Sequence, residues 1–103
     1  MLTLFGAIPD DDRVVRDGNI ITGGGVTAGM DFALVVAAEL AGARFAQALQ
    51  LGLEYAPAPP FNSGRPQTAP PEILTEVRSR MDAILPKRLA EARTAAARLA
   101  SSP

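Results

Sequence analysis

The 103-residue sequence contains no cysteine and no histidine. The lack of cysteine excludes disulfides, thiolate metal sites and a cysteine nucleophile within this chain. The lack of histidine removes the commonest general base and the commonest metal ligand. These two absences limit the chemistry open to the chain more than any residue that is present.

The chain also lacks a large net charge and a long apolar run. Ten basic and eleven acidic residues leave a formal charge of −1, so no basic field attracts nucleic acid or an anionic membrane. The longest uncharged run, 18–30, is broken by turn residues and predicts no membrane span. No basic region precedes an apolar stretch near the N-terminus, so we expect no signal peptide and a cytoplasmic location.

What remains is the composition of a folded chain. Apolar residues make up 48% and charged residues 20%, a balance typical of globular rather than disordered proteins. The length allows one domain at most, with a small core.

The first third of the chain predicts a hairpin that follows a polar turn. The aspartates at 10–12 are interpreted as a solvated loop, with a divalent-ion site as the alternative. The β-branched runs 14–15 and 20–21 flank the Asp-Gly pair at 17–18, which favours a tight turn. We expect a small hairpin or an edge ribbon here.

Two helices are expected after the hairpin. The segment 26–41 is apolar on all sides, which predicts a buried helix. The segment 43–55 carries Phe45, Leu49 and Leu53 four residues apart, which predicts a helix with one apolar face.

The C-terminal half is expected to begin with a proline-rich loop over 57–71. Residues 72–99 then form a long helical stretch that Pro86 kinks or restarts, because proline removes a helix hydrogen bond. Basic residues gather in this stretch, but acidic residues are interleaved with them. We therefore interpret it as a solvated helix face rather than a nucleic-acid contact.

The helix predicted over 26–41 needs cover on every side. In an α/β protein, a sheet covers one side of such a helix and neighbouring helices cover the other. This chain offers only about two short strands, whereas a stable open sheet usually needs about three. The sequence therefore reads as the last part of a larger doubly wound α/β domain. The surface that would cover the predicted helix is supplied by another chain or by an N-terminal half, or the helix stays uncovered.

A glycine-rich turn over 22–29, with the sequence TGGGVTAG, joins the predicted strand to the predicted helix. It places unpaired N–H groups at a helix N-terminus, where they stabilise negative charge. Gly23, Gly25 and Ala28 match a relaxed dinucleotide fingerprint, but that motif needs a following strand. A phosphate-binding P-loop needs a Gly-Lys-Ser/Thr ending, which is absent. Two interpretations therefore stay open. Either the turn holds an anionic active-site group that is contributed from elsewhere, or it has no chemical role.

Two segments resemble one known family. Residues 13–32, RVVRDGNIITGGGVTAGMDF, look like the C-terminal part of the ThiJ/PfpI superfamily, a class I glutamine amidotransferase-like group. Residues 50–64, QLGLEYAPAPPFNSG, resemble its isonitrile hydratase (cyclohexyl-isocyanide hydratase) branch. The resemblance runs from about Leu2 to the C-terminus, so it implies that residues 1–103 form a partial domain of this family.

The resemblance implies a flavodoxin-like doubly wound sandwich, mostly helical in this part, and usually a homodimer. It implies a lyase that hydrates a small isonitrile to an N-substituted formamide through a cysteine thiolate, with no metal or organic cofactor. In the family, that cysteine and its acidic partner lie upstream of the region matched here. We therefore expect no catalytic residue in this chain, a missing N-terminal half or a second chain as its partner, and no activity of the chain alone.

By the same resemblance, five residues line the pocket beside that cysteine: Gly23, Gly24, Gly25, Val26 and Thr27. The backbone N–H of Val26 is the candidate partner of the thiolate. The glycines suit this position because absent side chains let backbone and substrate approach closely. For the Thr27 side chain we favour a helix-capping role over ligand contact.

Three further side chains are assigned structural roles. Asp31 is expected to cap the helix or to pair with an upstream residue, and Tyr55 and Phe61 to pack the long loop. The alternative to an enzyme is a ligand-sensing or interaction module related to the amidotransferase-like domain of transcriptional regulators.

Overall fold

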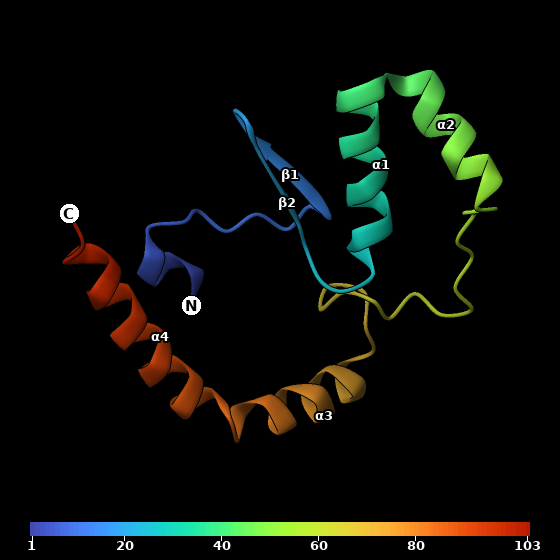
Figure 1. The fold of residues 1–103 in the computed structure, drawn as a ribbon. Coiled ribbons are helices and arrows are strands. Elements are labelled where there is room, and N and C mark those ends of the chain that lie inside the picture. Colours follow the sequence, from blue (N-terminus) through green and yellow to red (C-terminus); the bar gives the residue numbers. More distant parts are fainter. The chain divides into compact units, whose positions relative to one another are not determined.

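The computed structural model describes all residues, 1–103, and shows four α-helices, one 3-10 helix and two strands (Figure 1). In chain order the elements are η1 (Leu2–Phe5), β1 (Val14–Asp17), β2 (Ile20–Gly23), α1 (Ala28–Ala41), α2 (Ala43–Gly52), α3 (Pro71–Asp82) and α4 (Leu85–Ala100).

The chain divides into two compact units. One unit is Asp10–Pro57, and the other combines Met1–Pro9 with Ala58–Pro103. The boundary after residue 57 falls where the proline-rich loop begins, since an extended loop makes few contacts with either side.

Strands β1 and β2 form the predicted antiparallel hairpin, with Asp17 opposite Ile20. The turn residues are therefore Gly18 and Asn19, one position later than the predicted Asp-Gly pair. Gly18 has a φ of +61°, which suits the first central residue of a two-residue turn that requires a positive φ there. The sheet has only these two strands, so each has one edge without a partner.

Helix α1 contacts both the hairpin and α2 (Figure 1). It begins at Ala28, two residues later than predicted, and is followed by Gly42 with a φ of +89°. Only Ala28 in this helix is buried, and Leu40 is 83% exposed. The helix expected to need cover over 26–41 is therefore only partly covered by this chain, because the hairpin and α2 reach only part of its surface.

Helix α2 ends at Gly52, three residues before the predicted end at Tyr55. Glu54 has a φ of +51°, a left-handed conformation that cannot continue a right-handed helix. The N–H of Tyr55 then donates to the carbonyl of Gln50 at 3.1 Å, which satisfies one carbonyl of the last turn. The predicted apolar face of this helix is exposed: Phe45, Leu49 and Leu53.

In the second unit, α4 contacts both η1 and α3. Of the two outcomes expected near Pro86, a kink or a restart, the stretch 72–99 shows the restart, because α3 ends at Asp82 and α4 begins at Leu85. Pro86 accounts for the break, since a proline ring inside a helix collides with the carbonyl four residues earlier, here that of Asp82. Pro71 is the first residue of α3, so the proline-rich loop is one residue shorter than predicted.

Large apolar side chains are exposed on every α-helix, and the only buried residues are Ala28 and Ala46. The exposed set includes Met30, Val35, Leu40, Leu51, Ile73, Val77, Met81, Leu85 and Leu99. None of the helices combines the length and the apolar character that crossing a bilayer requires.

We predict that the 103-residue chain binds the dye ANS strongly in neutral buffer, because ANS fluoresces on exposed apolar surface. The double substitution Leu40→Glu and Leu51→Glu should lower the fluorescence, since both side chains are largely exposed. Fluorescence no higher than that of a well-packed protein of equal mass would contradict the exposed faces described above.

Candidate functional site

A bend over residues 24–27 joins β2 to α1 (Figure 1). The N–H of Gly24 donates to the carbonyl of Arg13 at 2.8 Å, which ties the start of the bend to the hairpin. The N–H of Gly29 donates to the carbonyl of Val26 at 3.3 Å, which ties the end of the bend to the first turn of α1. Four of the five residues predicted to line a pocket therefore lie in this bend, and the fifth, Gly23, is the last residue of β2.

The three consecutive glycines serve two purposes. A Cβ on Gly23 would lie 3.3 Å from the Cβ of Phe32. A Cβ on Gly24 would lie 3.3 Å from the carbonyl oxygen of Asp12. Both positions thus allow a close approach that a side chain would disturb. Gly25 has open space around it but a φ of +76°, so its backbone conformation, rather than crowding, favours glycine there.

The N–H groups of Gly25 and Val26 take part in none of the backbone hydrogen bonds of the chain. They directly precede the N-terminus of α1, where the helix dipole favours negative charge. The Val26 residue is also 98% exposed. The bend can therefore stabilise an anionic group, such as a thiolate or an oxyanion, that another part of a protein brings to it.

Thr27 occupies the N-cap position of α1, but its hydroxyl makes no capping hydrogen bond. The predicted capping role of the Thr27 side chain is therefore wrong. The reason is its helical backbone, with φ −77° and ψ −16°, because a capping side chain normally needs an extended backbone to reach the free N–H groups. Its carbonyl instead accepts a hydrogen bond from Nη2 of Arg13 at 2.9 Å.

Arg13, Asp31 and Tyr55 form a hydrogen-bonded cluster beside the bend. Asp31 accepts from Arg13 Nε at Oδ2 and from the Tyr55 hydroxyl at Oδ1, each at 2.5 Å. The expectation that Asp31 pairs with an upstream residue is thus confirmed. Tyr55, for which the sequence predicts only packing of the loop, has this polar contact in addition. Phe61 is 78% exposed and so contributes little packing to the loop.

The cluster shifts the pKa of each of its members. The hydrogen bond from Tyr55, followed by that from Arg13, lowers the pKa of Asp31. The hydrogen bond to Asp31 raises the pKa of the Tyr55 hydroxyl and that of the Arg13 guanidinium. All three shifts favour the same state, in which a charged carboxylate lies between a cation and a neutral phenol.

The sequence does not identify Arg13 and Tyr55 as partners of Asp31. They lie 18 and 24 residues away from it along the chain, and only the packing of α1 against its neighbours brings them together. One signal was available: Asp31 is the single acid in the first turn of a helix whose only other charged residue is Glu39, and a carboxylate on a largely apolar helix needs a partner where it is covered.

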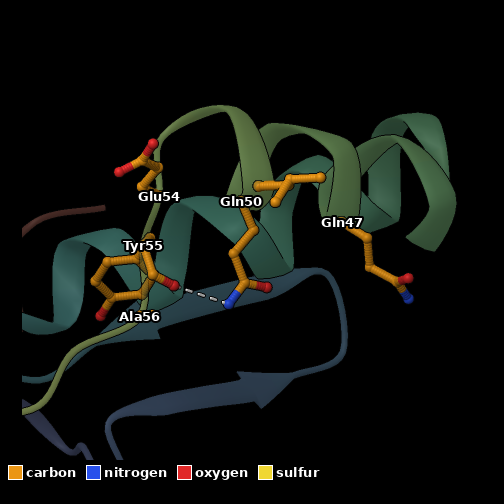
Figure 2. Close-up of a pocket in the computed structure, with 6 residues that line it drawn as sticks. Gln47, Gln50, Glu54, Tyr55 and Ala56 are labelled. Carbon is orange, nitrogen blue, oxygen red and sulfur yellow. Dashed lines mark hydrogen bonds between the residues drawn. The ribbon is translucent and has the colours of Figure 1, made fainter.

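An open hollow of about 550 Å³ lies at the C-terminal end of α2 (Figure 2). Its lining residues are Gln47, Gln50, Leu51, Glu54, Tyr55 and Ala56. Nε2 of Gln50 donates to the carbonyl of Tyr55 at 3.1 Å, drawn as the dashed line in Figure 2. None of the predicted pocket residues lines this hollow, and Tyr55 alone belongs both to it and to the cluster around Asp31.

The topology does not support the alternative in which the glycine turn is a dinucleotide-binding motif. After α1 the chain enters α2 rather than a strand, so the motif lacks the second strand that carries its acidic residue. No group of three or more acidic side chains is arranged to hold a metal ion. Among the aspartates at 10–12, the N–H of Asp12 donates to the carboxylate of Asp10 at 2.9 Å, as in a local turn.

The chain is similar to known proteins over most of its length. It is 57% identical over 99 residues to an isonitrile hydratase from Pseudomonas putida, covering 96% of this chain and 43% of that protein. The crystal structure of a ThiJ/PfpI family protein from Pseudomonas syringae matches with a TM-score of 0.74 and 47% identity, covering 92% of this chain and 38% of that one. No family model matches the chain. The chain thus spans less than half the length of each of these relatives.

We predict that the carboxyl carbon of Asp31, followed by NMR, titrates with a midpoint below its ordinary value of 3.8. The Tyr55→Phe substitution should move this midpoint upward, because it removes the larger of the two hydrogen bonds to the charged form. Since the pKa is lowered by folding, the stabilisation is complete above the ordinary value and is lost as the pH falls through the lowered one.

Phe61→Leu is the control for this titration, because Phe61 is an exposed aromatic residue without a hydrogen bond to Asp31. An unshifted Asp31 midpoint, or one that ignores the loss of the Tyr55 hydroxyl, would contradict the cluster.

Proposed function

Because the chain belongs to the ThiJ/PfpI superfamily and corresponds to its C-terminal portion, we propose that it is the C-terminal part of an isonitrile hydratase-like enzyme. The α/β fold class predicted from the sequence is that of the structural relative. The complete enzyme would add water to an isonitrile and release an N-substituted formamide.

The proposed reaction requires a nucleophile that this chain does not contain, since it has no cysteine. A cysteine thiolate from the remainder of the enzyme would form a bond to the isonitrile carbon, and the same carbon would take a proton from the acidic partner of that cysteine, which gives a thioimidate. Water would then add to this carbon, giving one proton to the nitrogen and returning the other to the acidic partner, while the C–S bond breaks and the thiolate leaves as the formamide forms. Every atom of the product comes from the isonitrile and one water molecule.

One observation carries the role of the bend in this proposal: Gly25 and Val26 have N–H groups without an acceptor in the chain. A free N–H beside a helix N-terminus lowers the energy of a nearby thiolate. The Val26 N–H is the proposed partner of that thiolate, and residues 23–27 form one wall of the proposed pocket. Removing one such donor in other enzymes costs roughly 2.7–4 kcal/mol of transition-state stabilisation.

This magnitude is also the reason that we expect no activity from the chain alone. Enzymes lower reaction barriers by about 8–23 kcal/mol, far more than one backbone donor supplies. The bend can lower the energy of a thiolate nucleophile, but it cannot supply the nucleophile itself.

The partner of the chain in this proposal is the N-terminal part of the same domain, as a preceding segment or as a second chain. The exposed apolar faces of α1 and α2 support this partner, because helices of a doubly wound fold bury such faces against the sheet. A homodimer of the completed domain, as the family resemblance implies, and a cytoplasmic location belong to the same proposal.

We predict that a chimera, in which this chain replaces the matching C-terminal residues of the Pseudomonas putida relative, hydrates cyclohexyl isocyanide. Formation of N-cyclohexylformamide, followed by chromatography, is the measurement. The isolated 103-residue chain should give no more product than buffer. A chimera that folds and binds the isonitrile without turnover would favour the ligand-sensing alternative instead.

We also predict that Gly25→Ala lowers the turnover of the chimera by at least about tenfold, because the substitution strains the bend that presents the Val26 N–H. Gly42→Ala is the matched control. Gly42 likewise has a positive φ and open space for a Cβ, but it lies at the opposite end of α1. Both variants should lose stability, on the order of 1–3 kcal/mol. Equal losses of turnover would show that backbone strain alone, rather than the bend, sets the activity.

A further inference from the structure

Arg13 holds the glycine bend at both of its ends. Its carbonyl accepts from the N–H of Gly24 at 2.8 Å. Its guanidinium donates through Nη2 to the carbonyl of Thr27 at 2.9 Å. Between these two contacts lie Gly25 and Val26, whose N–H groups have no acceptor in the chain.

We propose that Arg13 is a positioning residue that fixes the direction of the Gly25 and Val26 N–H groups toward the reacting centre. This inference rests on the proposed function, because the N–H groups need a direction only if they meet a reacting group. Arg13 itself does not touch that group in the proposal. It acts through the backbone of the bend, which would otherwise pivot at Gly25, a residue with wide conformational freedom.

Asp31 makes this contact of Arg13 possible. A guanidinium near the N-terminus of α1 meets the positive end of the helix dipole, which disfavours it. The Asp31 carboxylate, in the first turn of the same helix, offsets that charge and accepts from Arg13 Nε. The Tyr55 hydroxyl donates to the second carboxylate oxygen, so both oxygens of Asp31 are engaged and its orientation is fixed.

The chemistry of this contact requires arginine rather than lysine at position 13. A planar guanidinium presents separate N–H groups in a fixed fork, so Nε meets Asp31 while Nη2 meets the Thr27 carbonyl. A lysine ammonium is a single flexible point charge, which would follow the carboxylate and release the carbonyl. We therefore expect Arg13→Lys to keep the ion pair and to lose the hold on the bend.

The chain provides a matched control in Arg16. This residue lies in β1, whereas Arg13 directly precedes that strand, and it pairs with a carboxylate of α1, that of Glu39. Its other hydrogen bond goes to the carbonyl of Gly18 in the hairpin turn, at 3.1 Å. Arg16 therefore joins the same two elements as Arg13 without touching the bend.

The experiment compares Arg13→Lys and Arg16→Lys in the chimera described above. Arg13→Lys should lower kcat for cyclohexyl isocyanide by roughly 10- to 100-fold, the loss expected from a displaced catalytic group. Its KM should stay within about threefold, because the substrate itself has lost no contact. Arg16→Lys should leave both constants near those of the parent chimera.

Amide hydrogen exchange of Gly24 and Gly29 is a second, independent measurement of how firmly the bend is held, because their N–H groups close its two ends. Both amides should exchange faster in Arg13→Lys and should be unchanged in Arg16→Lys. Where Arg13→Lys does not fold, Tyr55→Phe takes its place, since it loosens the same cluster by one hydrogen bond. It should lower kcat and speed the same amides to a smaller degree.

Equal effects of the Arg13 and Arg16 variants would overturn the inference, as would an unchanged kcat in both Arg13→Lys and Tyr55→Phe. A parent chimera without activity would contradict the proposed function instead. In that case the exchange rates of Gly24 and Gly29 in the same variants still decide whether Arg13 holds the bend.

Discussion

The connection between the hairpin and α1 is the constraint on which the rest of the Asp10–Pro57 unit depends. Two arginine–carboxylate pairs make this connection, Arg13 with Asp31 near one end of α1 and Arg16 with Glu39 further along it. Apolar contact accompanies these pairs, since Phe32 of α1 lies against Gly23 of β2 and is half-buried. Exposed ion pairs are individually weak, so they fix the relative direction of the two elements more than they stabilise the contact.

The weakness of the apolar core has a counterpart in the exposed faces of the helices. Burying a large aliphatic or aromatic side chain stabilises a fold by about 1.5–3 kcal/mol, and residues such as Leu40, Phe45 and Leu51 do not obtain this stabilisation within the chain. The relatives are more than twice as long as the matched region. Covering these faces with the remainder of such a fold would supply stabilisation that the surface ion pairs cannot.

The glycine bend belongs to this same connection, and this links stability to the proposed chemistry. Its first N–H is bound by the backbone of Arg13, and its last carbonyl by the side chain of the same residue. The N–H groups between these two contacts have no acceptor in the chain, because the hydrogen bonds that hold the bend are made by the residues on either side of them. In the proposed enzyme, the half of the pocket formed here thus consists of backbone, which suits stabilisation of charge and leaves nucleophilic attack to another segment.

Local features of the chain followed from the sequence alone. The β-branched runs predicted the hairpin, the apolar segments predicted α1 and α2, and the glycines predicted a strand-to-helix bend, because these preferences act between residues a few positions apart. The boundaries moved where one residue took an unexpected conformation, as Glu54 did at the end of α2. The family resemblance also came from the sequence, since it rests on residue identities.

The tertiary structure decided which distant side chains meet. The three members of the cluster come from different segments, and no local preference relates them: Arg13 directly precedes β1, Asp31 lies in α1, and Tyr55 follows α2. Their hydrogen bonds exist only once the helix has docked beside the strands, because a side-chain contact depends on the relative direction of two elements. The sequence predicted that this chain alone cannot cover α1, but only the packing shows which of its residues stay exposed, Leu40 among them, because that depends on where the hairpin and α2 dock.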